Sequence, residues 1–285
     1  MKVTALAHAK LNLTLDVLEK RPDGYHDISS VFQSISLFDK LEVTRTEKDI
    51  LINTDSEIAP EDNICVRAAR LFFDATKLSG GAEILLQKNI PIAAGLGGGS
   101  ADGAATLKAL NLLYKSPLSD KELLLLSAKL GADVPFCLFG GTAHATGIGE
   151  KLIKLPDLPC CDIIIIKNAG KPSTAELYKR LDECEIPNRP DTDAAVLAIK
   201  QGDLKNACDN FSNVFSCAWG DTLKAIENDL KAQGAYTACL SGSGPTVYGI
   251  FKKGEGEKAL VTLKETYADI HLCTPHASPG VEIIE

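Results

Sequence analysis

Apolar and polar residues alternate at the start of the chain, between Val3 and Val17. This period of two predicts a strand with one buried face. The turn signal Arg21-Pro-Asp-Gly24 follows, and Phe32 to Val43 predicts a second strand that is broken near Phe38. The apolar positions of the first strand share one parity: Ala5, Ala7, Ala9, Leu11, Leu13, Leu15 and Val17.

Helix signals appear next. Asp62 is placed to cap a helix over about 63–75, and 82–87 predicts a short strand. Ser100 is placed to cap a helix that runs to about Tyr114. Ser119-Asp-Lys-Glu122 is a capping box for one more helix, which we expect Gly131 to end.

The pattern changes after Pro156. A buried strand is predicted over 162–167, Ser173 begins a second capping box, and helical periodicity continues to Gly234. Strands, a helix and a last strand complete the order β-α-β-β-α-β, which is the ferredoxin-like plan. Their expected ranges are 236–240, 246–252, 256–268 and 270–274. We therefore expect an α+β protein with an N-terminal domain over 1–156 and a ferredoxin-like domain over 157–285.

Composition narrows the classes of partner. The 285 residues are 45% hydrophobic and carry a net charge of −8, which disfavours nucleic acid. The N-terminus lacks the apolar core of a signal peptide, and apolar runs such as 163–166 are too short for a membrane. We expect a cytoplasmic protein without membrane contact. Nine cysteines without a C-x-x-C pair, and five histidines without ligand spacing, predict reduced core thiols and no structural zinc.

Four glycines lie within five residues, at Gly95, Gly97, Gly98 and Gly99, directly before Ser100. Such a cluster indicates tight backbone geometry or close approach of a ligand, and the following helix N-terminus favours a phosphate. Lys88 is close enough in sequence to add a positive charge. A flexible connection is the alternative. The P-loop and the protein-kinase motifs are absent, and the glycine loop does not fit the dinucleotide fingerprint. Gly254-x-Gly256-x-x-Ala259 fits a loose form of that fingerprint, but Glu255 and Glu257 would repel a pyrophosphate, so we interpret it as a strand-to-helix turn.

A second loop of small residues, Ser241-Gly-Ser-Gly-Pro-Thr246, lies between two predicted strands. Because the two loops fall in different halves of the chain, they suggest a ligand held between domains. The members assigned to this second glycine loop are Ser241, Gly242, Ser243 and Gly244.

Together these motifs resemble the GHMP kinase superfamily. Pro91 to Asp102 is similar to its central motif and Ser241 to Thr246 to its C-terminal motif. Ala9-Lys-Leu-Asn-Leu13 with Arg21-Pro-Asp-Gly-Tyr-His26 is similar to one branch, whose acceptor is a polyol linked to cytidine diphosphate. Glu61-Asp-Asn-Ile64 and Gly131-Ala-Asp-Val-Pro135 match the same branch, whereas 184–215 matches least.

The resemblance implies the GHMP kinase fold, with a ribosomal S5 domain 2-like N-terminal domain. It also implies transfer of the ATP γ-phosphate, with Mg²⁺, to a tertiary hydroxyl in the non-mevalonate route to isoprenoid precursors. Lys10 and Asp133 become the catalytic pair: Asp133 accepts the hydroxyl proton, while Lys10 keeps it ionised and stabilises the alkoxide. The alternatives are an exposed strand lysine and an aspartate that caps a helix or forms a turn.

The remaining assignments also follow from the resemblance. Ser100 is placed near Mg²⁺, and no other protein ligand for a metal is assigned. Stacking of Tyr25 and Tyr178 on a pyrimidine would contribute about 1–3 kcal/mol per base, and Phe32 is equally suited to core packing. The ATP-binding residues are Asn63, Lys88, Pro91, Gly95, Leu96, Gly97, Gly98, Gly99, Ser100 and Ala101. The residues for the acceptor are Asn12, Tyr25, His26, Phe32, Thr174 and Tyr178.

Two other interpretations remain open. A homoserine or mevalonate kinase of the same family would have no use for a Tyr/His/Tyr pocket. A non-catalytic nucleotide- or RNA-binding protein could share the N-terminal fold, although the acidic charge and the Lys10–Asp133 pair disfavour it. The expected partner is a small molecule, and the expected state is a monomer or weak homodimer.

Overall fold

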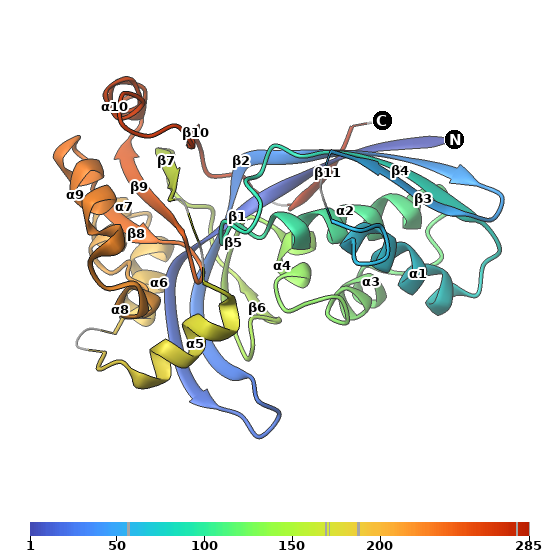
Figure 1. Ribbon diagram of the computed structural model, residues 1–285, viewed down its shortest axis with the longest axis horizontal. Helices are drawn as coiled ribbons and strands as arrows, with labels where there is room; N and C mark the ends of the chain where they lie inside the picture. Colours follow the sequence, from blue (N-terminus) through green and yellow to red (C-terminus); the bar gives the residue numbers. More distant parts are fainter. Residues whose placement is uncertain (56–57, 169, 171, 187–188, 278, 285) are drawn as a thin grey trace.

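The computed structural model describes residues 1–55, 58–168, 170, 172–186, 189–277 and 279–284. In this part of the chain the elements form two lobes, each with its own sheet (Figure 1). The helices of the first lobe are α1 (Ile64–Thr76), α2 (Gly98–Leu113), α3 (Asp120–Ser127) and α4 (Val134–Phe139). Among the described residues, no helix is both long enough and apolar enough to span a membrane.

The first lobe carries a sheet of seven strands in the order β11-β1-β2-β4-β3, with β5 paired to β2 and β6 to β5. Helices α1 to α4 lie along one side of this sheet (Figure 1). The long strands β1 and β2 pair antiparallel, and their ribbon bends toward the second lobe. The strands are β1 (Lys2–Lys20), β2 (His26–Thr46), β3 (Ile50–Thr54), β4 (Gly81–Gln87), β5 (Thr142–Thr146), β6 (Lys151–Lys154) and β11 (Val281–Ile283).

The second lobe has an antiparallel sheet in the order β10-β7-β9-β8. Numbered within this lobe, the order is 4-1-3-2, so the ferredoxin-like plan expected from the chain is confirmed. The strands are β7 (Cys161–Lys167), β8 (Thr237–Leu240), β9 (Thr246–Lys252) and β10 (Ile270–Cys273). The helices are α5 (Thr174–Glu183), α6 (Thr192–Gln201), α7 (Leu204–Asp209), α8 (Phe215–Trp219), α9 (Lys224–Ala232) and α10 (Gly256–Leu263), with a 3₁₀ turn over Gly220–Leu223.

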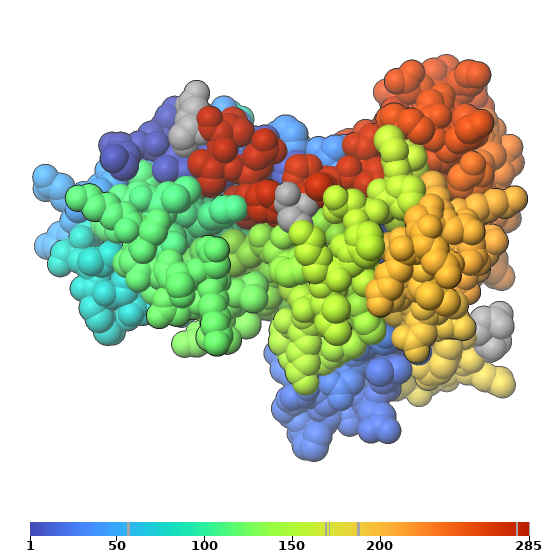
Figure 2. Space-filling view, turned by 180° about the vertical axis from the view of Figure 1, so that it is seen from behind, coloured from blue at the N-terminus to red at the C-terminus, as the bar shows by residue number. Residues whose placement is uncertain are grey.

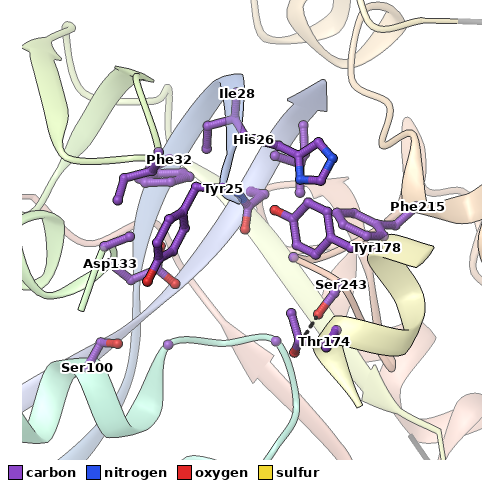
Figure 3. A pocket seen from close by; sticks show the side chains of 18 of the residues that line it. Tyr25, His26, Ile28, Phe32, Ser100, Asp133, Thr174, Tyr178, Phe215 and Ser243 are labelled. Atoms are coloured by element: carbon purple, nitrogen blue, oxygen red, sulfur yellow. Dashed lines mark hydrogen bonds between the residues drawn. The ribbon is translucent and has the colours of Figure 1, made fainter. Parts of the chain in front are cut away.

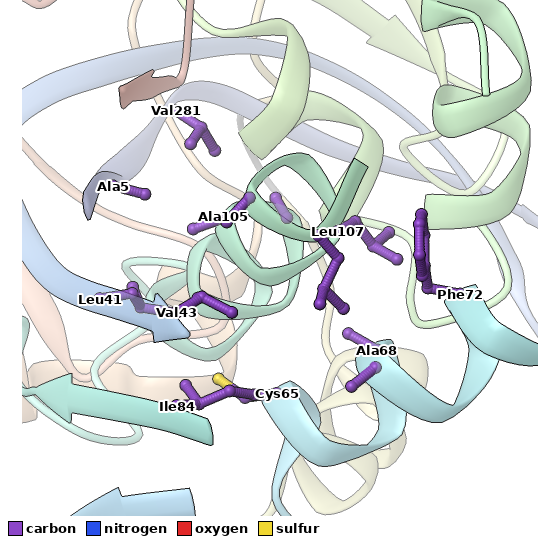
Figure 4. Packing of buried hydrophobic residues seen from close by; sticks show 14 of the residues in the cluster. Ala5, Leu41, Val43, Cys65, Ala68, Phe72, Ile84, Ala105, Leu107 and Val281 are labelled. Carbon is purple, nitrogen blue, oxygen red and sulfur yellow. The ribbon is translucent and has the colours of Figure 1, made fainter. Parts of the chain in front are cut away.

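The core of the first lobe lies between its sheet and helices α1 and α2. Figure 4 shows Leu41, Val43 and Ile84 of the sheet facing Ala105 and Leu107 of α2. Small residues on α2 let the helix approach the strands closely, because alanine side chains leave little bulk between the two backbones. Fully burying a large aliphatic side chain contributes about 1.5–3 kcal/mol, so this layer holds α2 and its N-terminus firmly in place.

The strand β7 explains why its sequence is apolar without alternation. Ile164 and Ile166 pack with α5, α8, α9 and α10, whereas Ile163 and Ile165 pack with α6, α7 and β1. Both faces of this strand are therefore buried. Tyr248 of β9 joins the same inter-lobe core, and its hydroxyl donates a hydrogen bond of 2.9 Å to Leu13 O of β1.

The last strand, β11, leaves the second lobe and returns to the first sheet, where Val281 lies opposite Ala7. Figure 2 shows the C-terminal segment, in red, running across the back of the molecule toward the N-terminus. The boundary proposed at 156 and 157 stays a prediction. The strands divide between the two sheets at that point except for β11.

Several expectations about element ends were wrong. Asn63, not Asp62, caps α1, and its side chain accepts a hydrogen bond from the amide of Cys65. Gly97, not Ser100, is the N-cap of α2, and α3 ends at Ser127, before Gly131. Strand β2 continues past Phe38, because two extra residues form a bulge against β1 and pairing then resumes. The short elements β3, β5, β6, α4 and β11 were not predicted.

The capping boxes and the cysteines agree better with expectation. Ser119 and Glu122 form the reciprocal capping box of α3, and the Ser173 hydroxyl accepts from the amide of Glu176 at the start of α5. All nine cysteines are described and free, and Cys65, Cys137 and Cys239 are buried.

Candidate active site

Two cavities meet at the glycine loop. The larger, about 710 Å³, lies between the lobes, and the smaller, about 400 Å³, lies within the first lobe beside α1 and α2. Gly95, Gly97 and Ser100 line both of them. Molecules bound in the two cavities can therefore meet at the start of α2.

The start of α2 is an exposed group of backbone donors. Its N-cap, Gly97, has φ +69° and offers no side-chain cap. Within the described residues, the amides of Gly98, Gly99 and Ser100 have no hydrogen-bond partner. Free N–H groups and the positive end of the helix dipole together favour a phosphate group at this position.

Gly95 and Gly97 are required here by space as well as by conformation. Gly95 has φ +78°, and a methyl group on it would lie 2.5 Å from Ser241 O of the second loop. At Gly97 a methyl group would lie 2.9 Å from Cγ of Lys10. The glycines thus allow two other segments to approach the loop closely, which a larger residue would prevent.

Ser241 connects three segments at this junction. Its hydroxyl donates to Gly95 O at 3.0 Å and accepts from the amide of Asn12 at 3.3 Å. The side chain is completely buried. The neighbouring Gly242 and Ser243 line the larger cavity, whereas Gly244 packs against Trp219. The second loop therefore closes one wall of the cavity and fixes the first loop to β1.

Lys10 and Asp133 line the larger cavity, and Lys10 lies next to Gly97 of the glycine loop. Lys10 Nζ is 3.2 Å from Asp133 Oδ2 and donates to Asn12 Oδ1 at 2.7 Å. The ammonium also lies 4.5 Å from the centre of the Phe32 ring. Lys10 is only 4% exposed, so it is not an ordinary surface lysine of a strand. The Asp133 side chain keeps 35% of its surface exposed and so can meet a ligand.

An aromatic region forms the other end of the larger cavity (Figure 3). His26 stacks on Tyr178 with ring centres 4.9 Å apart, and Phe215 meets Tyr178 edge-on at 4.9 Å. His26 Nε2 lies 3.2 Å from Asp182 Oδ1. Burial, with a smaller effect of the Asp133 charge, raises the pKa of Tyr178 to about 12. The Tyr178 hydroxyl therefore stays neutral.

Tyr25 and Phe32 complete this region, and they differ in burial. Tyr25 is 59% exposed, whereas Phe32 is fully buried and packs edge-on against Phe136. The ring stacked on Tyr178 is that of His26, and the expected stacking of Tyr25 and Tyr178 on a pyrimidine stays a prediction. Phe32 serves as core and as cavity wall together.

Lys88 lies between two carboxylates. Its ammonium donates to Asp39 and, at 2.7 Å, to Asp102. The other oxygen of Asp39 accepts from the backbone amides of Asn89 and Ile90. Lys88 is thus not a solvated surface lysine, and its charge is already balanced by Asp39.

Lys88, Asp39 and Asp102 form a triad of charged side chains, and within it Asp102 has an unusual environment. Its second carboxylate oxygen, Oδ1, is buried without a hydrogen-bond partner in the described chain. Burial, reinforced by the charge of Asp39 and opposed by Lys88, raises the pKa of Asp102 to about 8. A protonated Asp102 leaves the triad without net charge, which suits a wall of a cavity for a polyanion.

The residues expected for ATP gather around the smaller cavity, with one exception. Ala101 lies in the hydrophobic core and does not reach the cavity. Of the residues expected for ATP, those that line the smaller cavity are Asn63, Lys88, Pro91, Gly95, Leu96, Gly97, Gly98, Gly99 and Ser100. Those expected for the acceptor all line the larger cavity: Asn12, Tyr25, His26, Phe32, Thr174 and Tyr178.

Sequence reasoning missed several lining residues. Asp182 lies one helical turn after Tyr178, a spacing that places both on one face of α5 and could have been noticed. Phe215 lies in the poorly matching segment 184–215, of which 187 and 188 are outside the described residues. Ile58 and Ile92, half-exposed in the smaller cavity, carried no signal of their own.

Comparisons with known proteins agree with this geometry. Residues 63–141 match the family model described as GHMP kinases N terminal domain, and residues 219–269 match GHMP kinases C terminal. The 4-diphosphocytidyl-2-C-methyl-D-erythritol kinase of Caldicellulosiruptor saccharolyticus is 42% identical over 275 residues, which cover 94% of this chain and 95% of the relative. The enzyme of the same name from Clostridium acetobutylicum is 40% identical and covers 93% and 97%.

Solved structures of this family and fold also match the chain. The crystal structure of a 4-(cytidine 5'-diphospho)-2C-methyl-D-erythritol kinase superposes with a TM-score of 0.81 at 31% identity, covering 96% of this chain and 100% of that chain. A homoserine kinase from Cytophaga hutchinsonii has a TM-score of 0.77 at 17% identity, covering 99% and 97%, and so shares the fold.

Gly95→Ala should weaken ATP binding by about tenfold or more, since the methyl group must displace the backbone of the Ser241 loop and left-handed alanine adds about 1–2 kcal/mol of strain. The matched control is Gly254→Ala, which has φ +88° but open space around its Cβ. Calorimetric titration with ATP should separate the two variants. Equal affinity of both variants and the wild type would contradict the steric role of Gly95.

Asp102→Asn should flatten the dependence of stability on pH. In the wild type the folded state holds a proton on Asp102 that the unfolded state releases near pH 4, so the free energy of unfolding falls as the pH rises toward 8. An asparagine side chain does not take up or release this proton, so the variant lacks this contribution to the pH dependence. Urea midpoints at pH 5, 6.5 and 8 test this, with Asp74→Asn on the exposed surface of α1 as control. A variant with the full wild-type slope would disprove it.

Proposed function

The chain belongs to the 4-diphosphocytidyl-2-C-methyl-D-erythritol kinases of the GHMP kinase family, and we propose that it transfers the γ-phosphate of ATP to the 2-hydroxyl of that cytidine-linked polyol. The product belongs to the non-mevalonate route to isoprenoid precursors. One observation carries the assignment: the Lys10–Asp133 pair lies where a phosphate-binding helix start opens into a cavity with an aromatic end.

ATP would lie in the smaller cavity with its phosphates at the start of α2. Asn63 and the glycine loop line this cavity, and Ile58 and Ile92 offer apolar surface for the base. The free amides of Gly98, Gly99 and Ser100 would hold phosphate oxygens and direct the terminal phosphate toward the larger cavity. This arrangement supplies positioning and charge stabilisation, which phosphoryl transfer chiefly requires.

The donor set around Ser100 fits Mg²⁺. The Ser100 hydroxyl and the Asp133 carboxylate line the same cavity, and both are hard oxygen ligands. We assign Ser100 as the residue that would hold the ion. When bound, Mg²⁺ supplies neutralisation of the charge on the phosphate oxygens.

The acceptor would lie in the larger cavity with its base among Tyr25, His26 and Tyr178. Their rings suit a flat pyrimidine, and the His26–Asp182 contact fixes the orientation of the imidazole that would read the edge of the base. The polyol would then extend toward Asn12, Lys10 and Asp133. The acceptor would extend through the cavity from its aromatic end to the glycine loop.

Proton transfer would occur at Asp133. Its carboxylate would accept the proton of the attacking hydroxyl, while Lys10, held by Asn12 and by the face of Phe32, would stabilise the developing oxyanion. Burial strengthens the effect of the Lys10 charge, because little water is present to screen it. Separate substitutions of Lys10 and of Asp133 would show how much each residue contributes to proton transfer.

The test of the acceptor is ADP formation with ATP and Mg²⁺ on a panel of acceptors. We expect turnover on the cytidine-linked polyol, and a large loss of kcat/KM on the same polyol phosphate without its cytidine. Homoserine and mevalonate should give no turnover above the ATPase background. Turnover on either of them, with none on the cytidine compound, would refute the proposal, and no turnover on any acceptor would favour a non-catalytic binding protein.

Asp133→Ala should lower kcat by about 10²–10⁴-fold, the range typical of a lost general base, while the Kd for ATP changes little. Asp157→Ala, which removes an exposed carboxylate that lines neither cavity, is the matched control. Calorimetry gives the Kd and a coupled ADP assay gives kcat. Near wild-type turnover of the Asp133 variant would remove this residue from the mechanism.

A further inference from the structure

Three distant segments of the chain meet on the side of the first sheet where the C-terminal segment returns. His8 lies on β1, His276 lies in the connection between β10 and β11, and Glu282 lies on β11. Their ligand atoms lie within 4.8 Å of one another. None of the three lines either cavity of the candidate active site, so the proposed kinase reaction does not account for them.

Backbone carbonyls fix the tautomers of both histidines. His8 Nδ1 lies 3.0 Å from Ile35 O, and His276 Nε2 lies 3.2 Å from Pro279 O. A carbonyl oxygen only accepts, so each of these nitrogens carries the hydrogen. In the neutral rings the lone pairs are therefore on His8 Nε2 and His276 Nδ1. A histidine oriented through its other nitrogen by a carbonyl is the usual arrangement of a metal ligand.

The arrangement around His8 Nε2 lacks a positive charge. This nitrogen is buried, and no hydrogen-bond partner is found for it in the described chain. The nitrogen lies 3.7 Å from Glu282 Oε2, too far for a hydrogen bond. A buried lone pair and a carboxylate oxygen at this distance repel, and a cation between them removes the conflict.

The ion must be shared between two stacked rings. The imidazoles of His8 and His276 are stacked with centres 3.5 Å apart, so their in-plane lone pairs run parallel instead of meeting at one point. His8 is 4% exposed and held by Ile35 O, so the His276 ring must turn out of the stack for both nitrogens to bind one ion.

We propose that His8 Nε2, His276 Nδ1 and Glu282 bind one divalent transition-metal ion, for which Zn²⁺ is the best match. Two imidazoles and one carboxylate are a usual zinc set, with water as fourth ligand. A 3.7 Å separation of nitrogen and oxygen is close to the about 3.4 Å between ligands of a tetrahedral ion with bonds of about 2.0–2.2 Å. Mg²⁺ and Ca²⁺ prefer oxygen ligands and fit less well.

The site can adjust to the ion from its outer side. The His8 ring is held by Ile35 and by the edge of Phe38, whereas His276 and Glu282 are partly exposed. These two side chains can close around the ion and admit water. Because His276 is in the connection from the second lobe and His8 is in the first sheet, the ion would tie the returning C-terminal segment to β1.

The test is zinc binding by the full-length protein after chelator treatment, without nucleotide or Mg²⁺. Calorimetry should show one equivalent of Zn²⁺ bound. His276→Ala and Glu282→Gln, both at partly exposed positions, should each weaken binding by about 100-fold or more. His271→Ala, a histidine of β10 in contact with Asp269, is the matched control and should bind as the wild type does.

Two further readouts separate this site from the nine cysteines. Zn²⁺ should raise the thermal unfolding midpoint of the wild type and of His271→Ala but not of the two ligand variants, which should melt like the metal-free wild type. Bound Co²⁺ should show d–d bands without a thiolate charge-transfer band. Absence of stoichiometric binding, binding unchanged in both ligand variants, or a thiolate band would each overturn the proposal. Kinase activity is not the readout, so a failure of the proposed function leaves this test intact.

Discussion

The buried hydroxyl of Ser241 joins the parts of the molecule on which the candidate site depends. This hydroxyl, which belongs to the second lobe, forms hydrogen bonds with Gly95 O of the glycine loop and with the amide of Asn12 on β1. Gly95 has no side chain, so the two loops can meet backbone to backbone. This contact sets the distance between the start of α2 and the Lys10–Asp133 pair. A shift of about one ångström at such a contact is enough to misplace reacting groups.

Charge is balanced differently on the two sides of this junction. Lys88 and Asp39 cancel each other beside the smaller cavity, and a protonated Asp102 adds no charge. In the proposed function the attraction for phosphate would therefore be left to the amides at the start of α2, which would bind through direction more than through net charge. Lys10 lines the larger cavity beside the glycine loop, close to where charge would develop during transfer. This division of roles would keep the strongest charge for the reacting atoms.

Local patterns in the sequence predicted much of the fold and part of the site. Alternation gave β1, capping boxes gave α3 and α5, and the element order predicted the ferredoxin-like sheet, which the strand order confirms. The family resemblance brought Lys10 and Asp133 together, although no spacing relates them, and the structure places them 3.2 Å apart. Gly97 was missed as a cap because a left-handed glycine looks like loop in a sequence.

What the sequence did not predict depends on contacts between distant residues. Ser241 meets Gly95 from 146 residues away, and Lys88 meets Asp39 from 49 away. The grouping of His8 with His276 and Glu282 arises only because β11 returns to β1, so a search for ligand spacing along the chain had no means of finding it. Short half-exposed strands such as β6 were missed for a related reason, since their pairing partners and not their own residues stabilise them.

The most direct measurement is a crystal structure of the protein with a non-hydrolysable ATP analogue and 4-diphosphocytidyl-2-C-methyl-D-erythritol. The account predicts the triphosphate against the amides of Gly98, Gly99 and Ser100, and the base among Tyr25, His26 and Tyr178. The acceptor hydroxyl should lie about 3 Å from Asp133 and in line with the γ-phosphate. A triphosphate bound away from the start of α2, or an acceptor hydroxyl out of reach of Asp133, would contradict it.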